Sequence, residues 1–346
     1  MIKRKSYSTH KAGSFNRLKL VEEELASPEA HEVQVQVKAV GLNFADVFAI
    51  LGLYSATPEG SFIPGLEYSG EILAKGSEVK DFQVGDRVMG VTRFGAYTSH
   101  INIDYAYVNK IPESWSFEEG ASFLVQALTA YYGLFYLGNL QKGDTVLIHS
   151  AAGGVGLLAN RMAQKSGAFT IGTIGSAAKI DLLKKEGYQK YIVRSKHFKR
   201  DLEEALHGRE LNVIMECIGG KIFKIGYEML APQGRVVNYG SARYGGTSNS
   251  PNWPRLAWLY LTRPKIDPQK MIESNKGLLG FNLIWLYEKK ELMQQILNEL
   301  EALNMEAPYI GHRFKFDEMH EALKLFQSGK TMGKVVLTID DLEPRT

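Results

Sequence analysis

The stretch TVLIHSAAGGVG, residues 145–156, decides the fold. Its first four residues predict a buried strand, and SAAGGVG follows before a helix begins. This is the glycine fingerprint of a dinucleotide-binding turn, with Ala151 in place of the first glycine. Gly153 lets the backbone approach a pyrophosphate, Gly156 lets the helix pack on the strand, and the helix N-terminus offers free N–H groups. The other residues of the predicted phosphate site are Ala152, Gly154 and Val155.

Two different patterns flank this turn. After about residue 127, helical segments alternate with predicted strands at 145–149, 169–174, 190–193, 212–217 and 235–239. This alternation is typical of βαβ units and a parallel sheet. Before residue 127, residues 33–39 alternate apolar with polar, and short strands between Gly, Asp and Ser clusters predict an antiparallel barrel or sandwich. The sequence therefore predicts an α/β protein with a β-rich domain and a doubly wound parallel-sheet domain.

Composition narrows the classes of function. The 346 residues predict about two domains, and a net charge of +3 argues against a nucleic-acid partner. The single cysteine excludes an internal disulfide and every multi-cysteine metal site. No apolar run reaches the ~18 residues that span a bilayer, and the basic start is not followed by a signal-peptide core. We therefore expect a cytoplasmic protein.

The residues after the second predicted strand indicate the cofactor. An NAD-preferring site places an acid there, against the ribose 2′-hydroxyl. This chain instead has Ser176 and Lys179, which could bind a 2′-phosphate. Because lysines at such positions are usually solvated, the missing acid is the stronger half of the argument. We predict NADPH as the cofactor.

In combination and order, the motifs resemble one family. GLNFADVFAILGLY, IPGLEYSG, VGDRVMG, HSAAGGVG and KGLLGFNL resemble the zinc-independent quinone oxidoreductases of the medium-chain dehydrogenase/reductase superfamily, closest to the vesicle amine transport protein 1 group. The resemblance implies a GroES-like catalytic domain at 1–126 and 290–346, interrupted by a Rossmann NADP-binding domain at 127–289. It also implies a homodimer formed edge to edge by the Rossmann sheets.

The departures from the zinc-dependent relatives suggest the chemistry. Those relatives place a cysteine near Asn43 and a histidine where Leu66 stands, so the resemblance implies no metal in this chain. Without a Lewis acid, the acceptor must itself delocalise the charge that arrives with a hydride. Quinones and α,β-unsaturated carbonyls do so. We therefore expect an NADPH-dependent reductase of one of these small-molecule classes.

The resemblance also implies the site residues. Asn43 and Tyr54 are expected catalytic residues, and Asp46 is a weaker one that could instead hold Asn43. Asn43 could also be only a helix N-cap, and Asp46 only a first-turn acid. Phe48, where relatives often have tyrosine, indicates a more apolar pocket. Further residues expected at the cofactor are Gln126, Thr129, Arg194, Gly240, Ser241, Phe281 and Leu283. Arg194 could also lie in solvent.

Two alternative functions stay open. Enoyl thioesters share the conjugated acceptor, so the chain could be an enoyl-thioester reductase. It could also bind NADPH mainly as a membrane- or trafficking-associated protein. Residues 244–275 predict a loop and a short amphipathic helix, interpreted as a lid or subunit contact, or as a weak membrane contact through 251–265. Cys217 is interpreted as a small buried side chain.

Overall fold

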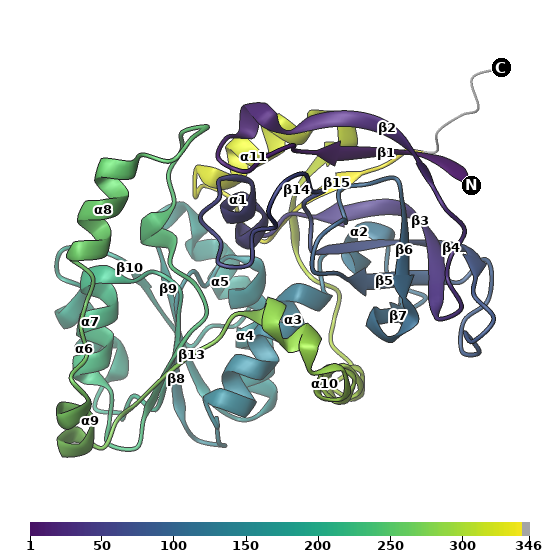
Figure 1. The fold of residues 1–346 in the computed structure, drawn as a ribbon. Coiled ribbons are helices and arrows are strands. Elements are labelled where there is room, and N and C mark those ends of the chain that lie inside the picture. The colour runs from purple at the N-terminus through teal and green to yellow at the C-terminus, as the bar shows by residue number, and fades with distance from the viewer. Residues whose placement is uncertain (341–346) are drawn as a thin grey trace.

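The computed structural model describes residues 1–340, which form two lobes around two sheets (Figure 1). The Rossmann lobe is built on a six-stranded parallel sheet in the order β10-β9-β8-β11-β12-β13. Its strands are β8 (Thr145–Ile148), β9 (Phe169–Ile174), β10 (Lys190–Val193), β11 (Val213–Glu216), β12 (Arg235–Asn238) and β13 (Gly277–Gly280). The helices between them are α4 (Gly154–Lys165), α5 (Ile180–Lys185), α6 (Phe198–Leu206) and α7 (Gly220–Met229).

The strand order of this sheet reverses between β8 and β11. From β8 the chain steps outward through β9 to β10, and it then crosses over to β11 on the other side of β8. A reversal of this kind leaves a crevice beyond the carboxyl ends of the strands, where doubly wound folds bind their ligands. The predicted strands are confirmed: two have the predicted bounds, two are one residue shorter at one end, and β11 is one residue shorter at each end.

The GroES-like lobe carries the mainly antiparallel sheet β14-β15-β3-β4-β5-β7, with β6 paired to β3. Its strands are β3 (Glu32–Gly41), β4 (Glu67–Lys75), β5 (Arg87–Val91), β6 (His100–Asp104), β7 (Val108–Lys110), β14 (Ile310–Lys315) and β15 (Lys334–Thr338), and β1 (Ile2–Ser8) forms a separate hairpin with β2 (Lys19–Leu25). In β3 the alternating residues Val33, Val35 and Val37 are buried, as the sequence pattern predicts. The last strand, β15, returns to pair with β3. The domain boundaries at 126 and 289 stay predictions.

Short helices connect and cover the sheets. They are α1 (Phe44–Ile50), α2 (Phe117–Gly120), α3 (Leu124–Tyr131), α8 (Trp253–Leu261), α9 (Pro268–Ser274), α10 (Lys290–Ala302) and α11 (Met319–Gln327). Single turns of 3₁₀ or π helix lie at Phe15–Arg17, Tyr105–Tyr107, Tyr132–Leu137, Ala177–Lys179, Ala242–Tyr244, Leu283–Glu288 and Phe316–Glu318. The segment 244–275 therefore holds two short helices where one is predicted. Both lie at the outer side of the Rossmann lobe (Figure 1).

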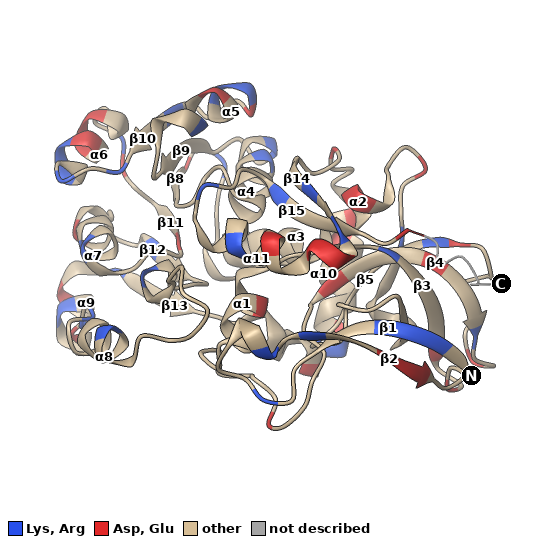
Figure 2. Ribbon diagram, turned by 90° about the horizontal axis from the view of Figure 1, so that it is seen from above, with Lys and Arg blue, Asp and Glu red and all other residues tan. Residues whose placement is uncertain are grey.

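The two lobes meet at the glycine turn. Gly333, just before β15, donates its backbone N–H to the carbonyl of Ala152 at 2.7 Å. Seen from above, the Rossmann elements gather on one side and the strands of the GroES-like lobe on the other, with basic and acidic residues scattered over both (Figure 2). Within residues 1–340, no helix is long and apolar enough to cross a bilayer.

Candidate active site

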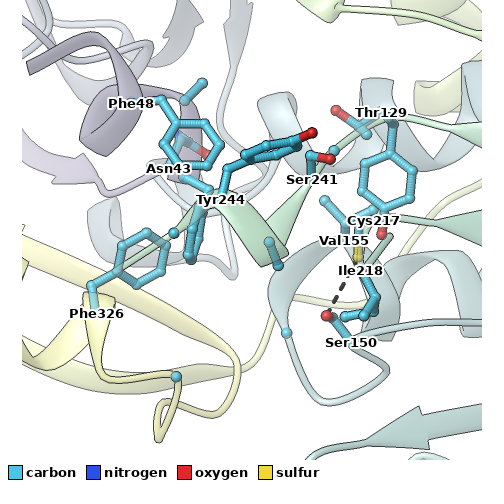
Figure 3. A pocket seen from close by; sticks show the side chains of 18 of the residues that line it. Asn43, Phe48, Thr129, Ser150, Val155, Cys217, Ile218, Ser241, Tyr244 and Phe326 are labelled. Atoms are coloured by element: carbon cyan, nitrogen blue, oxygen red, sulfur yellow. Dashed lines mark hydrogen bonds between the residues drawn. The ribbon is translucent and has the colours of Figure 1, made fainter. Parts of the chain in front are cut away.

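A cavity of about 1340 Å³, here called the interlobe cavity, lies between the two lobes. The glycine turn and the ends of the parallel strands line one end, and α1, α8 and α11 contribute to the other. Figure 3 shows Ser150, Val155 and Cys217 on the first side and Phe48 and Phe326 on the second. The fold thus joins the strand-end crevice to the segments that the resemblance assigns to the substrate.

The glycine turn has the geometry of a phosphate site. Helix α4 begins at Gly154 without a capping side chain, so its first N–H groups are not occupied by one. A Cβ on Gly156 would lie 2.6 Å from the carbonyl oxygen of Ser150, which explains the need for glycine there. A Cβ on Gly153 would meet only this oxygen, at 3.2 Å, so the cavity side is open. The turn fits the pyrophosphate of a dinucleotide.

The side chain of Gln126 is a second feature of the cavity that fits a bound nucleotide. Its side chain is buried and lines the interlobe cavity. The Nε2 atom donates to Asn43 Oδ1 at 2.6 Å, whereas Oε1 has no hydrogen-bond partner within the described part of the chain. An unpaired buried acceptor is costly, and a carboxamide N–H of a nicotinamide would satisfy it. The residues present therefore fit the cofactor that the sequence predicts.

Two cations lie at the far side of the glycine turn. Lys179 and Arg194 both line the interlobe cavity and are half-buried. Lys179 Nζ donates to the carbonyls of Gly329 and Thr331 at 2.8 and 2.7 Å, which uses two of its three hydrogens. Burial, followed by the charge of Arg194, lowers the pKa of Lys179. An anion between the two cations would relieve their repulsion.

The predicted role of Ser176 receives no support from its position. Ser176 is exposed, does not line the interlobe cavity, and accepts the N–H of Ala178 at 3.3 Å as a local cap. A serine that caps a helical turn is oriented by that turn. The alternative that Arg194 lies free in solvent is wrong, because its guanidinium donates to Thr173 Oγ1 at 3.2 Å.

Aromatic side chains wall the opposite end of the interlobe cavity. Phe48, Tyr244 and Phe326 lie together there (Figure 3), and Phe44 packs against Phe48 and Phe326 at ring distances of 5.5 and 5.4 Å. Leu256 of α8 also lines this end. The wall agrees with the apolar pocket expected from Phe48, and it places one side of α8 on the cavity. It suits a planar, apolar acceptor.

Tyr54 lines the interlobe cavity and pairs with a residue that the sequence analysis missed. Its hydroxyl donates to Asn282 Oδ1 at 2.5 Å, and Asn282 also lines the cavity. Burial raises the pKa of Tyr54 to about 12, with the bond to Asn282 acting in the opposite direction. The phenol is therefore neutral at physiological pH and can serve as a hydrogen-bond donor.

A buried cluster of four polar side chains closes the base of the interlobe cavity. Asn43 Nδ2 donates to Glu67 Oε1 at 3.0 Å and to the carbonyl of Gly41 at 3.2 Å. Asn43 Oδ1 accepts from Gln126 and from Lys334 Nζ, the latter at 2.9 Å. Both amide hydrogens are thus used by the protein. Asn43 lines the cavity as expected, but its bonds fit a positioning residue better than a donor to substrate.

Asp46 lies away from the cavity. It is fully buried, does not line the interlobe cavity, and accepts the backbone N–H of Asn43 at 2.7 Å and the hydroxyl of Tyr97 at 2.9 Å. Burial raises its pKa to about 7. Helix α1 begins after Asn43, as predicted. The geometry thus favours the role in which Asp46 holds Asn43, and not the catalytic role, because the carboxylate touches no ligand site.

The remaining predicted contacts all lie on the interlobe cavity. They are Thr129, Ala152, Gly153, Gly154, Val155, Gly156, Gly240, Ser241, Phe281 and Leu283. Cys217 also lines it, so its interpretation as only a small buried side chain is wrong. Its thiol donates to Ser150 Oγ at 3.4 Å (Figure 3). The sequence could have suggested that Cys217 lines the cavity, because this residue follows a parallel strand whose end forms the crevice.

Charge in the interlobe cavity has one sign. Within the described residues, three cationic side chains line it, Lys179, Arg194 and Lys334, and no carboxylate does. A cavity of this kind favours anionic ligands and negative charge that develops during a reaction. In residues 1–340, no group of three or more His, Cys, Asp or Glu side chains could hold a metal ion. The expected independence from zinc stays a prediction.

Comparison with known proteins decides the family. The zinc-binding dehydrogenase model matches residues 154–273, and the alcohol dehydrogenase GroES-like domain model matches residues 29–113. The human synaptic vesicle membrane protein VAT-1 homolog is 33% identical over 330 residues, which cover 94% of this chain and 84% of the relative. This chain belongs to the medium-chain dehydrogenase/reductase superfamily.

Three solved structures share the fold of this dehydrogenase/reductase over 97% of its chain and 99% of theirs. A mycobacterial protein complexed with NADPH has a TM-score of 0.83 at 27% identity. A quinone oxidoreductase from Pseudomonas syringae has a TM-score of 0.80 at 28% identity. The CurK enoyl reductase has a TM-score of 0.83 at 26% identity. The family, the two-domain fold and the resemblance to quinone oxidoreductases are thereby confirmed.

Proposed function

We propose that this dehydrogenase/reductase is an NADPH-dependent reductase of quinones or α,β-unsaturated carbonyls that works without zinc. The observation that carries the proposal is the interlobe cavity, with a glycine turn and two cations at one end and an aromatic wall at the other. NADPH, when bound, supplies a hydride. Among the similar structures, the mycobacterial NADPH complex and the Pseudomonas syringae quinone oxidoreductase support the same function.

The residues of the chain then have separate tasks. The glycine turn and the N-terminus of α4 bind the pyrophosphate, and Gln126 Oε1 accepts a carboxamide N–H. Phe48 and Tyr244 hold the acceptor ring and exclude water. Tyr54 donates to the acceptor oxygen when its hydroxyl hydrogen turns from Asn282 Oδ1 to that oxygen. Such donors act on charge that forms in the transition state, and removing one costs roughly 10²–10³ in rate.

The preference for NADPH over NADH rests on Lys179 and Arg194 in this proposal. Both have N–H groups at the cavity, and within residues 1–340 neither has a carboxylate within ion-pair distance. A 2′-phosphate between them would form charge-assisted hydrogen bonds. The ribose of NADH offers only a hydroxyl at this place, so its affinity should be lower.

The test is a screen of NADPH oxidation with quinones, enals, enones and enoyl thioesters, with NADH run in parallel. Turnover of a quinone, enal or enone with NADPH supports the proposal. If no acceptor oxidises NADPH although the nucleotide binds, the protein is not a reductase of these classes. Equal use of NADH would refute the 2′-phosphate argument alone. Activity that is lost with a chelator and restored by zinc would refute zinc independence.

An enoyl-thioester reductase is the second candidate. The CurK enoyl reductase among the similar structures favours it. A carrier phosphate would need cations near the mouth of the interlobe cavity, and Arg243 and Arg255 are the sequence neighbours of Tyr244 and Leu256, which line it. Arg255 NH2 already donates to the carbonyl of Arg243 at 2.9 Å. Turnover of enoyl thioesters, without turnover of quinones, would select this function.

A weak membrane contact through 251–265 is a further proposal, and the outer face of α8 favours it. Trp258 and Leu261 are 67% and 71% exposed, and Arg263 follows them. Exposed aromatic and basic side chains on a short helix suit an anionic bilayer surface. Liposome flotation should therefore retain the wild type and release Trp258→Ser/Leu261→Ser. If both stay in solution, the contact does not exist, and a role as a membrane-bound NADPH sensor loses its basis.

A homodimer and a cytoplasmic location also stay predictions. Strand β13 is at one edge of the Rossmann sheet, which leaves its outer side to pair with another strand. Light scattering after size exclusion would give twice the chain mass for a dimer, and a proline at Leu278 in β13 should release monomers. A wild-type monomer at micromolar concentration would contradict the predicted dimer.

A further inference from the structure

Lys334 occupies an unusual place for a lysine. It is the first residue of β15, and its side chain is only 3% exposed. The preceding residue, Gly333, bonds to the glycine turn, so Lys334 stands where the GroES-like lobe touches the nucleotide site. Its side chain nevertheless lines the interlobe cavity. A buried lysine at this junction brings a positive charge close to both predicted ligands.

The hydrogen bonds of Lys334 leave one hydrogen over. Its ammonium has three N–H donors. One goes to Glu67 Oε1 and one to Asn43 Oδ1 at 2.9 Å. Within residues 1–340, no further acceptor is bonded to Nζ. A third N–H donor therefore remains, and the side chain that carries it lines the cavity.

Glu67 does not cancel this charge at the cavity. The carboxylate does not line the interlobe cavity, and it is shared among several donors. Besides Lys334, it accepts from Asn43 and Gln126 through Oε1, both at 3.0 Å, and from the N–H of Val125 through Oε2 at 3.2 Å. The cluster thus presents its cation to the cavity and keeps its anion behind. The pKa of Lys334 is lowered overall, because burial outweighs the opposite effect of the Glu67 and Asp46 carboxylates.

The stability that a buried Lys334–Glu67 ion pair adds to the fold does not explain its presence at this position. The cost of removing two charges from water offsets much of their attraction, so apolar residues of similar volume often serve as well. A cation held at one position inside a water-poor cavity is, by contrast, effective at stabilising a developing negative charge. The geometry of the cluster suits this second use.

We infer that Lys334 is a catalytic residue whose free N–H donates to the carbonyl oxygen of the acceptor as that oxygen becomes negative. This inference rests on the proposed function. When a hydride adds to the β-carbon of an enone, the C=C π pair shifts toward the carbonyl and leaves an enolate oxygen. Lys334 holds that oxygen and keeps its own proton. Water then protonates the α-carbon, so that one hydride and one proton are added overall.

The test uses a stable mimic of the charged oxygen, 4-nitrophenol, titrated by absorbance on the protein without nucleotide. Lys334 should favour the phenolate, so the pKa of the bound phenol should fall by about one unit or more. The variants are Lys334→Arg, which keeps a cation paired with Glu67, and Lys334→Met/Glu67→Gln, which removes the cation without leaving an unpaired carboxylate. Lys324→Met, at an exposed position of α11, is the matched control.

Lys334→Arg and Lys324→Met should keep the lowered phenol pKa, whereas Lys334→Met/Glu67→Gln should lose it. In turnover, the double variant should lose about 10²-fold in kcat with NADPH affinity unchanged. If the double variant keeps the lowered phenol pKa, Lys334 does not act on the charged oxygen and the inference is wrong. An unshifted phenol pKa in the wild type overturns it as well, even if the double variant does not fold. Failure of the acceptor screen would refute the proposed function, and the nitrophenol titration would still decide the role of Lys334.

Discussion

Replacement of Asp46 by asparagine should change how stability depends on pH. The side chain is fully buried, and Oδ1 has no hydrogen-bond partner within residues 1–340. Oδ2 accepts from Asn43 and Tyr97 at 2.7 and 2.9 Å, and an asparagine Oδ1 could accept both bonds. Asp46→Asn therefore removes the ionisable group and keeps the two donors satisfied. It mimics the protonated acid.

The magnitude follows from the raised pKa. Burial raises the pKa of Asp46 from 3.8 to about 7, so the folded protein binds a proton that the unfolded chain has already released. Stability from this group is complete below pH 3.8 and is lost as the pH rises to about 7. The shift of about three pH units corresponds to roughly 4 kcal/mol. About 3 kcal/mol of this loss of stability occurs between pH 5 and pH 8.

The assay is urea unfolding, followed by tryptophan fluorescence, at pH 5, 6, 7 and 8. The free energy of unfolding of Asp46→Asn, relative to wild type, should rise by about 3 kcal/mol across this range. Asp181→Asn is the control, because the Asp181 side chain is 97% exposed, and it should follow the wild-type curve. A difference between Asp46→Asn and wild type that stays constant from pH 5 to pH 8 would refute the reasoning.

Three further substitutions test the site. Lys179→Ala should raise the KM for NADPH about 10-fold to 100-fold, because a charge-assisted bond is lost, and leave the KM for NADH unchanged in steady-state assays. Tyr54→Phe should lower kcat about 10²-fold while NADPH affinity, measured by fluorescence titration, stays the same; unchanged kcat would remove Tyr54 from the chemistry. Gly156→Ala places a Cβ 2.6 Å from the carbonyl oxygen of Ser150, so urea unfolding should reveal a loss of about 1–3 kcal/mol, and an unaffected protein would contradict the close packing.

Local patterns predicted the Rossmann lobe well. The strand at 169–174 and the glycine turn before α4 were both readable, because periodicity and turn residues act over a few neighbouring positions. The same turn led correctly to the strand-end crevice. Most of the residues that the motifs predict as cofactor contacts therefore line the interlobe cavity.

Contacts between distant segments could not be predicted in this way. Lys334 and Asn43 are 291 positions apart, and Tyr54 and Asn282 are 228 apart. Only the return of β15 to β3 brings Lys334 to Asn43. The one local sign of a role for Lys334 is that this lysine is the first residue of a mainly apolar strand. The role of Ser176 stays a prediction, because a serine in this position suits a phosphate site and a helical cap equally well.

Transfer of deuterium from NADPH to the product is a direct test of hydride transfer to a conjugated acceptor. The wild type is incubated with NADPH in which both hydrogens of the nicotinamide C4 are deuterium, together with the enone or enal that reacts fastest, and the product is analysed by mass spectrometry. The saturated product should contain one deuterium, bound to its β-carbon. A product without deuterium at that carbon, or NADPH that binds and transfers none to any acceptor, would contradict this hydride transfer.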